Sequence, residues 1–226
     1  MTGLPFPASL MGRLIVSCQA APGDPLDNVD TLTRIATSVV RGGAGGLRAN
    51  GVRCIAAFRR ETPLPILGIH KQKISNQVSI TPDFASAQAI SEAGADVIAL
   101  DCSAARHAEA EPWPGLIARI HAELGRPVLA DIATFEEALA AEAGAADAVA
   151  TTLYGFTPET ERARTVNWEM VERLAGTLRI PLIVEGHISQ PNEVRRALDL
   201  GAFSVVVGSA ITRPESITAR FVDAIR

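Results

Sequence analysis

Short apolar segments alternate with longer helical stretches from one end of the chain to the other, and this alternation limits the possible folds. Several segments are almost continuously apolar, which is typical of parallel strands that are covered on both faces. Stretches such as 82–93 and 134–143 have the pattern of helices, and Thr134 with Glu137 predicts a capping box. The predicted strands are 14–19, 46–49, 66–69, 97–101, 128–131, 148–153, 182–185 and 204–208.

A weak internal repeat supports an alternating α/β chain. Four predicted strands follow a Gly-Ala pair at a helix end, and three others follow a proline. Glycine suits the left-handed residue after a helix, and proline suits the first position of a strand. The repeat predicts a (β/α)8 TIM barrel as one domain over 1–226, with 1–12 as an N-terminal extension; an open doubly wound sheet is the alternative. The pairs start at Gly43, Gly94, Gly144 and Gly201, and the prolines are Pro65, Pro127 and Pro181.

The composition excludes several other classes of protein. With 47% hydrophobic residues and a net charge of −4, the chain lacks the signature of a disordered protein. The slightly acidic balance gives no electrostatic footprint for nucleic acid or an anionic membrane, so neither is expected as a partner. No segment reaches the ~18 apolar residues of a membrane helix, and Arg13 interrupts the segment that resembles a signal peptide. A soluble, cytoplasmic protein is expected.

The cysteines and histidines do not follow the spacing of disulfide frameworks or metal sites. The three cysteines, Cys18, Cys54 and Cys102, are an odd number without a CxxC motif, so we expect buried, reduced thiols. No histidine pair has the spacing of metal ligands, so no metal is expected. His107 and His121 are expected at the surface.

Polar residues stand at the carboxyl ends of the predicted strands, where a TIM barrel carries its active site. Lys71 lies two residues beyond the third strand, on the same side as Ile69 if the strand period of two continues. We therefore expect the polar side chains to converge on one rim of the barrel. The others are Gln19, Arg48, Asp101, Asp131 and Glu185.

Lys71 and Glu185 are the predicted proton-transfer residues. Of the 21 basic residues only Lys71 and Lys73 are lysines. Arginine keeps its proton near neutral pH, whereas a lysine in a water-poor cup can release one. A Schiff base on Lys71 is the alternative to proton transfer.

Two glycine-containing segments, 185–189 and 208–214, follow the last two predicted strands and indicate a phosphate site. Barrel phosphate sites recur after these strands, because glycines let backbone N–H groups approach the anion. Arg213 would add a charge-assisted hydrogen bond. Ordinary turns between strand and helix are the alternative.

These motifs together resemble the N-acetylmannosamine-6-phosphate 2-epimerase family, in the right order from about residue 12 to 226. The resemblance implies a TIM barrel that interconverts N-acetylmannosamine 6-phosphate and N-acetylglucosamine 6-phosphate in sialic acid catabolism, without a cofactor. It is carried by 17–20, 48–50, 68–71, 100–101, 130–132, 151–157, 185–186 and 207–214.

The resemblance also implies roles for individual residues. Lys71 and Glu185 take the catalytic positions, and the chain departs from the family at rim residues such as 154–156 and His187, which affects the expected substrate preference. The expected partners are a small sugar phosphate and, in a homodimer, a second copy of the chain. A Schiff-base aldolase and a non-catalytic sugar-phosphate-binding protein are the alternatives. The implied sugar-binding residues are Gln19, Arg48 and Asp131, and the implied phosphate-binding residues are Gly186, Gly208, Ser209 and Arg213.

Overall fold

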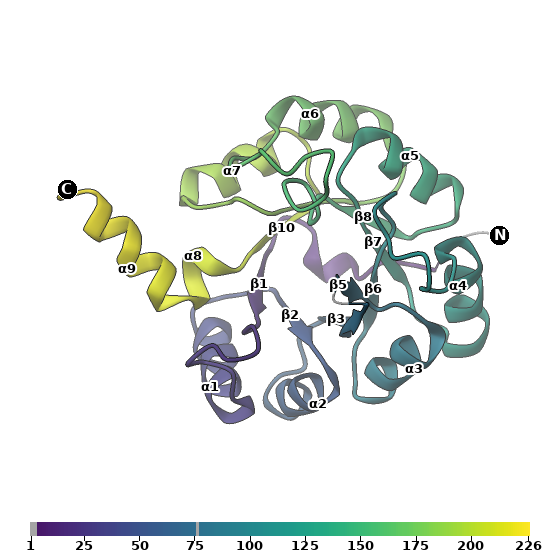
Figure 1. Cartoon of the computed structure of the whole chain (residues 1–226), viewed down its shortest axis with the longest axis horizontal. Coiled ribbons are helices and arrows are strands. Elements are labelled where there is room, and N and C mark those ends of the chain that lie inside the picture. The colour runs from purple at the N-terminus through teal and green to yellow at the C-terminus, as the bar shows by residue number, and fades with distance from the viewer. Residues whose placement is uncertain (1–3, 76) are drawn as a thin grey trace.

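Eight parallel strands close into a barrel at the centre of the computed structural model, which describes residues 4–75 and 77–226 (Figure 1). The order around the barrel is β1-β10-β9-β8-β7-β6-β3-β2. The closed barrel confirms the predicted fold and excludes the open doubly wound sheet. The strands are β1 (Leu14–Cys18), β2 (Gly46–Asn50), β3 (Ile66–Ile69), β6 (Val97–Asp101), β7 (Val128–Asp131), β8 (Ala148–Ala150), β9 (Leu182–Glu185) and β10 (Ser204–Val207).

Helices surround the barrel, and most connect one strand to the next (Figure 1). The predicted capping box is confirmed, because the Thr134 side chain accepts a hydrogen bond from the Glu137 N–H while the Glu137 side chain bonds back to Thr134. No helix of the described residues is long and apolar enough to span a membrane. The helices are η1 (Ala8–Leu10), α1 (Val29–Arg41), α2 (Val52–Glu61), α3 (Phe84–Glu92), α4 (Trp113–Arg119), η2 (Ile120–Leu124), α5 (Phe135–Ala143), α6 (Trp168–Thr177), α7 (Pro191–Asp199), α8 (Ser209–Thr212) and α9 (Pro214–Asp223).

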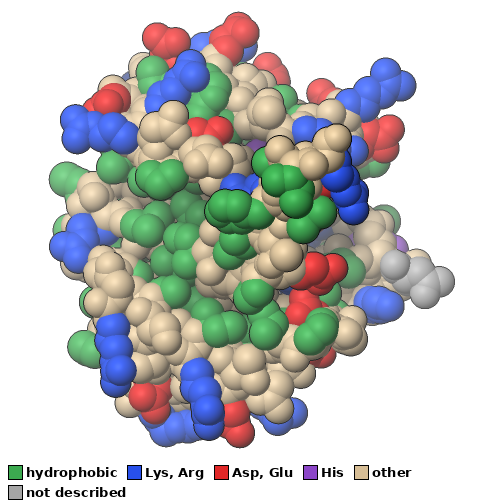
Figure 2. Space-filling model, turned by 90° about the vertical axis from the view of Figure 1, so that its left-hand side faces the viewer, with side chains coloured by type: hydrophobic (Ala, Val, Ile, Leu, Met, Phe, Trp, Pro, Cys, Tyr) green, Lys and Arg blue, Asp and Glu red, His purple; other side chains and the backbone are tan. Residues whose placement is uncertain are grey.

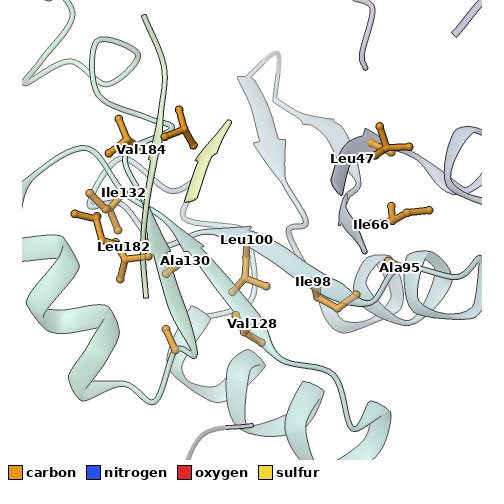
Figure 3. Packing of buried hydrophobic residues seen from close by; sticks show 14 of the residues in the cluster. Leu47, Ile66, Ala95, Ile98, Leu100, Val128, Ala130, Ile132, Leu182 and Val184 are labelled. Carbon is orange, nitrogen blue, oxygen red and sulfur yellow. The ribbon is translucent and has the colours of Figure 1, made fainter. Parts of the chain in front are cut away.

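The strand side chains feed two hydrophobic layers, which explains why the strands are apolar on both faces. One layer fills the barrel interior with residues such as Leu67, Leu129 and Ile183. The other lies between strands and helices; Figure 3 shows members such as Leu100 and Val184. Burial on both faces gives each strand roughly 25 cal/mol per Å² of apolar area removed from water.

The N-terminal extension contributes to the interior layer. Phe6 and Leu10 are buried in it, and the Phe6 ring packs edge-on against Phe203, with the centroids 5.9 Å apart. Residues 1–3 of the extension lie outside the described residues. The remainder of the extension thus packs with the barrel core.

The Gly-Ala pairs do not all end their helices in the same way. Gly43, Gly94 and Gly201 have φ of 98°, 107° and 100°, as expected for a left-handed helix end. At Gly144-Ala145 the prediction is wrong, because Ala145 and not Gly144 takes the left-handed conformation, with φ 67°. Gly144 is required there for space instead: a Cβ on it would lie 2.4 Å from the Trp113 ring.

The segment after β3, where the sequence predicts no strand, folds into a hairpin. Strands β4 (Lys71–Ile74) and β5 (Gln77–Ile80) pair antiparallel, with Lys71 opposite Ile80. Thr81 closes the hairpin, since its N–H donates to the His70 carbonyl and its hydroxyl donates to the Ala99 carbonyl. The hairpin lies near the barrel axis in Figure 1 and brings Lys71 to the mouth of the barrel.

His121 was expected at the surface, but its side chain is largely buried. Its Nε2 lies 2.7 Å from Asp147 Oδ2, and its side chain is only 11% exposed. The same Asp147 oxygen accepts the Val128 N–H, so this pair joins η2 to the start of β7. The cysteines are free: Cys18 and Cys102 are buried and Cys54 is half-buried, and burial raises the pKa of Cys18 to about 12.

Candidate functional site

A cavity of about 730 Å³ opens at the carboxyl ends of the barrel strands, within the size range of small-molecule sites. Most of the predicted site residues line it. Arg48 and Asp131 are instead fully buried, in contact with the cavity residues Thr152 and Glu185. The predicted residues that line the cavity are Gln19, Lys71, Glu185, Gly186, Gly208, Ser209 and Arg213.

Arg48 crosses the barrel interior from β2 and joins two carboxylates on strands far from its own. It forms a bidentate ion pair with Asp131, with N···O distances of 3.0 and 2.5 Å. Its Nη1 also forms an ion pair with Glu185. Burial opposes the charge on Arg48, but Asp131 and Glu185 outweigh it and raise the arginine pKa. The side chains of Arg48 and Asp131 are only 1% and 0% exposed, so this ion pair lies buried beneath the cavity residues Thr152 and Glu185.

Glu185 is the last residue of β9 and contacts the buried Arg48–Asp131 ion pair. Burial raises the pKa of its carboxyl group, while Arg48 opposes that shift. Its backbone is held by Thr151, whose hydroxyl accepts the Glu185 N–H and donates to the Glu185 carbonyl. The hydroxyl of Thr152 lies 3.1 Å from Glu185 Oε2 and 2.6 Å from Asp131 Oδ1. Glu185 is thus a fixed carboxyl group whose affinity for a proton is increased.

Lys71 begins β4 and reaches the same cavity from the opposite part of the barrel. Its backbone N–H donates to Asn50 Oδ1 at 2.9 Å, which fixes the start of the hairpin. The residue is open to solvent through the cavity mouth, and it makes no salt bridge with any residue of 4–75 or 77–226. Although the residue is exposed, the cavity walls shield its ammonium group from water, and this desolvation is the main cause that lowers the lysine pKa. The Arg48 charge lowers the pKa further, whereas Glu185 and Asp131 act in the opposite direction. The structure therefore brings Lys71 and Glu185 to one cavity without pairing them.

Other predicted contact residues, among them Gln19, Gly186 and Gly208, line the same cavity as Lys71. Gln19 donates to Ser17 Oγ at 2.9 Å, and its buried Oε1 has no partner among the described residues. Gly186 has φ 96°, a conformation that a side chain would strain. A Cβ on Gly208 would lie 3.3 Å from Ser17 Cβ, so a side chain there has little room.

Several other cavity residues were given no catalytic or substrate-binding role by the sequence, although Asp101 was expected on the rim and His187 among the residues that affect substrate preference. Thr152 lies two residues beyond the end of β8, and the pair of threonines after this strand was a signal that could have found it. Asp101 is buried, its Oδ1 accepts from the Ser103 N–H and hydroxyl, and burial raises its pKa. Phe156 stacks on His187 with ring centroids 5.5 Å apart; both line the cavity, and their loops are distant in the sequence.

The fold and the cavity are those of a TIM-barrel enzyme with a small-molecule site at the carboxyl ends of its strands. A family model described as "Putative N-acetylmannosamine-6-phosphate epimerase" matches residues 32–226. The chain belongs to this family of isomerases.

Relatives named "Putative N-acetylmannosamine-6-phosphate 2-epimerase" support the assignment. One from Clostridium perfringens strain 13 is 42% identical over 216 residues, which cover 95% of this chain and 97% of the relative. Another from Cutibacterium acnes is 42% identical over 222 residues, covering 97% and 96%. The match therefore extends over nearly the full length of both chains.

Solved structures give the same result. The N-acetylmannosamine-6-phosphate 2-epimerase of C. perfringens superposes with a TM-score of 0.91 at 41% identity and covers 96% of this chain and 94% of that one. A thiamine phosphate pyrophosphorylase from Pyrococcus furiosus, at 18% identity and a TM-score of 0.62, shares the fold alone.

Proposed function

We propose that the chain interconverts N-acetylmannosamine 6-phosphate and N-acetylglucosamine 6-phosphate, as part of sialic acid catabolism. The observation that carries the proposal is one cavity with a lysine of lowered pKa and a carboxyl group of raised pKa. Shifts in these directions bring both groups closer to neutral pH, where acids and bases transfer protons most effectively. The family relationship supplies the substrate.

The reaction requires that the proton on C2, next to the C1 aldehyde of the opened sugar, leaves from one face and returns on the other. Neutral Lys71 accepts the C2 proton, and the electron pair of the broken C–H bond moves into an enolate at C1–C2. Glu185 assists ring opening or the second proton transfer. A positioned acid or base of this kind contributes about 10²–10⁴-fold to the rate.

The buried Arg48–Asp131 ion pair orients the Glu185 carboxyl group. Arg48 fixes Asp131 and Glu185, and the free Gln19 Oε1 provides an acceptor for a hydroxyl or amide group of the sugar. The sugar-binding roles of Gln19, Arg48 and Asp131 are part of this proposal. In the same cavity, the backbone N–H groups of Gly186, Gly208 and Ser209 would hold the phosphate together with Arg213. That list of phosphate contacts follows the family resemblance.

A pH profile tests the role of Lys71. The lysine must be neutral to accept the C2 proton, and its pKa lies below the usual 10.5. We expect kcat/KM to rise with pH through a midpoint below 10.5, because the neutral fraction of Lys71 grows as pH increases through its pKa. The profile is measured on the wild-type chain from pH 5 upward. A rate that falls steadily as pH rises would contradict a lysine base.

Product analysis separates this proposal from its two rivals. N-acetylmannosamine 6-phosphate is incubated with the purified chain, and N-acetylglucosamine 6-phosphate is followed by NMR. A Schiff-base aldolase would instead cleave its substrate and would be trapped on Lys71 by borohydride as a covalent adduct. A sugar-phosphate-binding protein would show saturable binding with no product.

We also propose a homodimer in which α9 contacts a second copy. Figure 1 shows α9 pointing away from the barrel, and none of its residues is buried. Phe221 and Ile225 are 73% and 86% exposed, and Figure 2 shows apolar side chains gathered on the face that carries α9. A second copy would remove this apolar surface from water. The free, largely buried thiols and the sugar-phosphate substrate support a cytoplasmic location for the proposed enzyme.

Light scattering tests the dimer. Wild type is expected at twice 23.8 kDa, whereas Phe221→Asp with Ile225→Asp is expected as a monomer, because the charges would be desolvated in the interface. Met11→Asp is the control, since Met11 is also apolar and exposed but precedes β1 at the other end of the barrel. A monomeric wild type, or a dimeric double variant, would contradict an interface through α9.

A further inference from the structure

Two arginines line the end of the cavity formed by Gly186 and Ser209, and they differ in how their charge is balanced. We propose that the second of them, Arg220 on α9, binds the phosphate group of the substrate, so that α9 completes the site. This inference deepens the proposed function and depends on it. No motif in the sequence analysis pointed to Arg220.

Arg213, the arginine expected from the sequence, already has a carboxylate partner. Its Nη1 lies 2.8 Å from Asp24 Oδ2, and Asp24 is largely buried, with 12% of its side chain exposed. Its Nη2 donates a longer hydrogen bond, of 3.5 Å, to the Gln19 carbonyl. A phosphate dianion at Arg213 would have to compete with Asp24 for the same guanidinium group.

Arg220 has no such competitor. Its Nη1 donates to the carbonyl oxygen of Ser189 at 2.8 Å, and no carboxylate among residues 4–75 and 77–226 forms a salt bridge with it. Glu193 also contacts Ser189, but its Oε2 accepts hydrogen bonds from the N–H groups of Ser189 and Gln190. Within the part of the chain that the structure describes, the Arg220 charge therefore has no carboxylate partner.

The bond to Ser189 places Arg220 beside the predicted phosphate segment. Ser189 follows Gly186 by three residues, and both line the cavity, as does Ser216 one turn earlier on α9. A guanidinium group has five N–H donors, so a single bond to Ser189 leaves donors for an anion. Arginine binds phosphate through parallel N–H···O bonds that are about twice as strong as neutral ones.

The weak attachment of α9 gives a second reason. None of its residues is buried, so little apolar packing holds it against its own barrel. A phosphate group bridging Arg220 and the 186–189 segment would link α9 to the barrel when substrate is bound.

Steady-state kinetics on the full chain test the proposal, with three variants at one position. Arg220→Gln keeps an N–H donor for the Ser189 carbonyl but removes the charge, Arg220→Lys keeps a charge, and Arg220→Ala removes both. We expect Arg220→Gln and Arg220→Ala to raise KM about 10- to 100-fold with kcat within about threefold, as for the loss of a charged hydrogen bond. Arg220→Lys should recover part of the affinity.

Inorganic phosphate as a competitive inhibitor identifies the group that Arg220 contacts. Its inhibition constant should rise in Arg220→Gln by a factor similar to KM. Arg195→Gln is the matched control, because Arg195 is exposed on α7, pairs with Asp199 and does not line the cavity. Its KM and inhibition constant should equal those of wild type.

The proposal is overturned if Arg220→Gln keeps the KM of wild type, because Arg220 would then only tether α9 to Ser189. It is also overturned if KM rises while inhibition by phosphate is unchanged. If wild type has no epimerase activity, the proposed function fails, and direct titration with inorganic phosphate followed by ³¹P NMR still tests Arg220. Equal phosphate binding by wild type and Arg220→Gln, or none by wild type, would then overturn it.

Discussion

Lys71→Ala is expected to lower epimerase turnover by about 10²–10⁴-fold, because the variant lacks the group that accepts the C2 proton. The fold should be retained. Lys71 is open to solvent and makes no salt bridge with the described residues, so its removal leaves no buried charge without a partner. Turnover is measured by NMR on purified protein, and the melting temperature is measured on the same sample.

Lys73→Ala provides a matched control for this variant. Lys73 is the only other lysine, lies two residues later on the same strand β4 and is also exposed. It does not line the cavity, so its removal should leave turnover unchanged. Near wild-type turnover in Lys71→Ala, or equal losses in both variants, would refute the role given to Lys71.

Arg48→Met is expected to lower the free energy of unfolding by about 3–5 kcal/mol, the typical cost of leaving a buried charge without its partner. Asp131 is 0% exposed and binds Arg48 through both carboxylate oxygens, so it would lose its counterion in a site closed to water. Glu185 would lose its ion pair as well. Urea denaturation measures the effect.

The double variant Arg48→Met, Asp131→Leu distinguishes stability from activity. Replacing both charges by apolar side chains removes the unpaired carboxylate, so most of the lost stability should return. Turnover should stay low, because the Glu185 side chain then lacks the Arg48 ion pair that orients it. If Arg48→Met unfolds at the same urea concentration as wild type, the ion pair does not stabilise the folded protein as predicted.

The strands and the barrel could be predicted because their signal is local. Burial on both faces makes a parallel strand apolar along its length, as in 97–101, and the predicted range equals β6 (Val97–Asp101). The β4–β5 hairpin was missed, because the polar segment Lys71–Ile74 buries little and pairs only with β5. The sequence of polar and apolar residues in this segment is like that of a loop.

The pairing of side chains within the site could not be predicted, because it depends on residues distant in the sequence. The sequence placed Arg48, Asp131 and Glu185 on one rim but not in one ion-pair network, whose members are 83 and 137 residues apart along the chain. The same holds at Gly144, where the Trp113 ring, 31 positions earlier in the chain, leaves no room for a side chain. Local propensity sets the elements, and packing across the barrel sets these contacts.

The most direct test of the account is the reaction carried out in D₂O. Wild type is incubated with N-acetylmannosamine 6-phosphate, and C2 of both sugar phosphates is followed by NMR. The account predicts that N-acetylglucosamine 6-phosphate forms with solvent deuterium at C2, because the proton removed by Lys71 exchanges before it is returned. Absence of conversion, or a product that retains its original proton at C2, would contradict it.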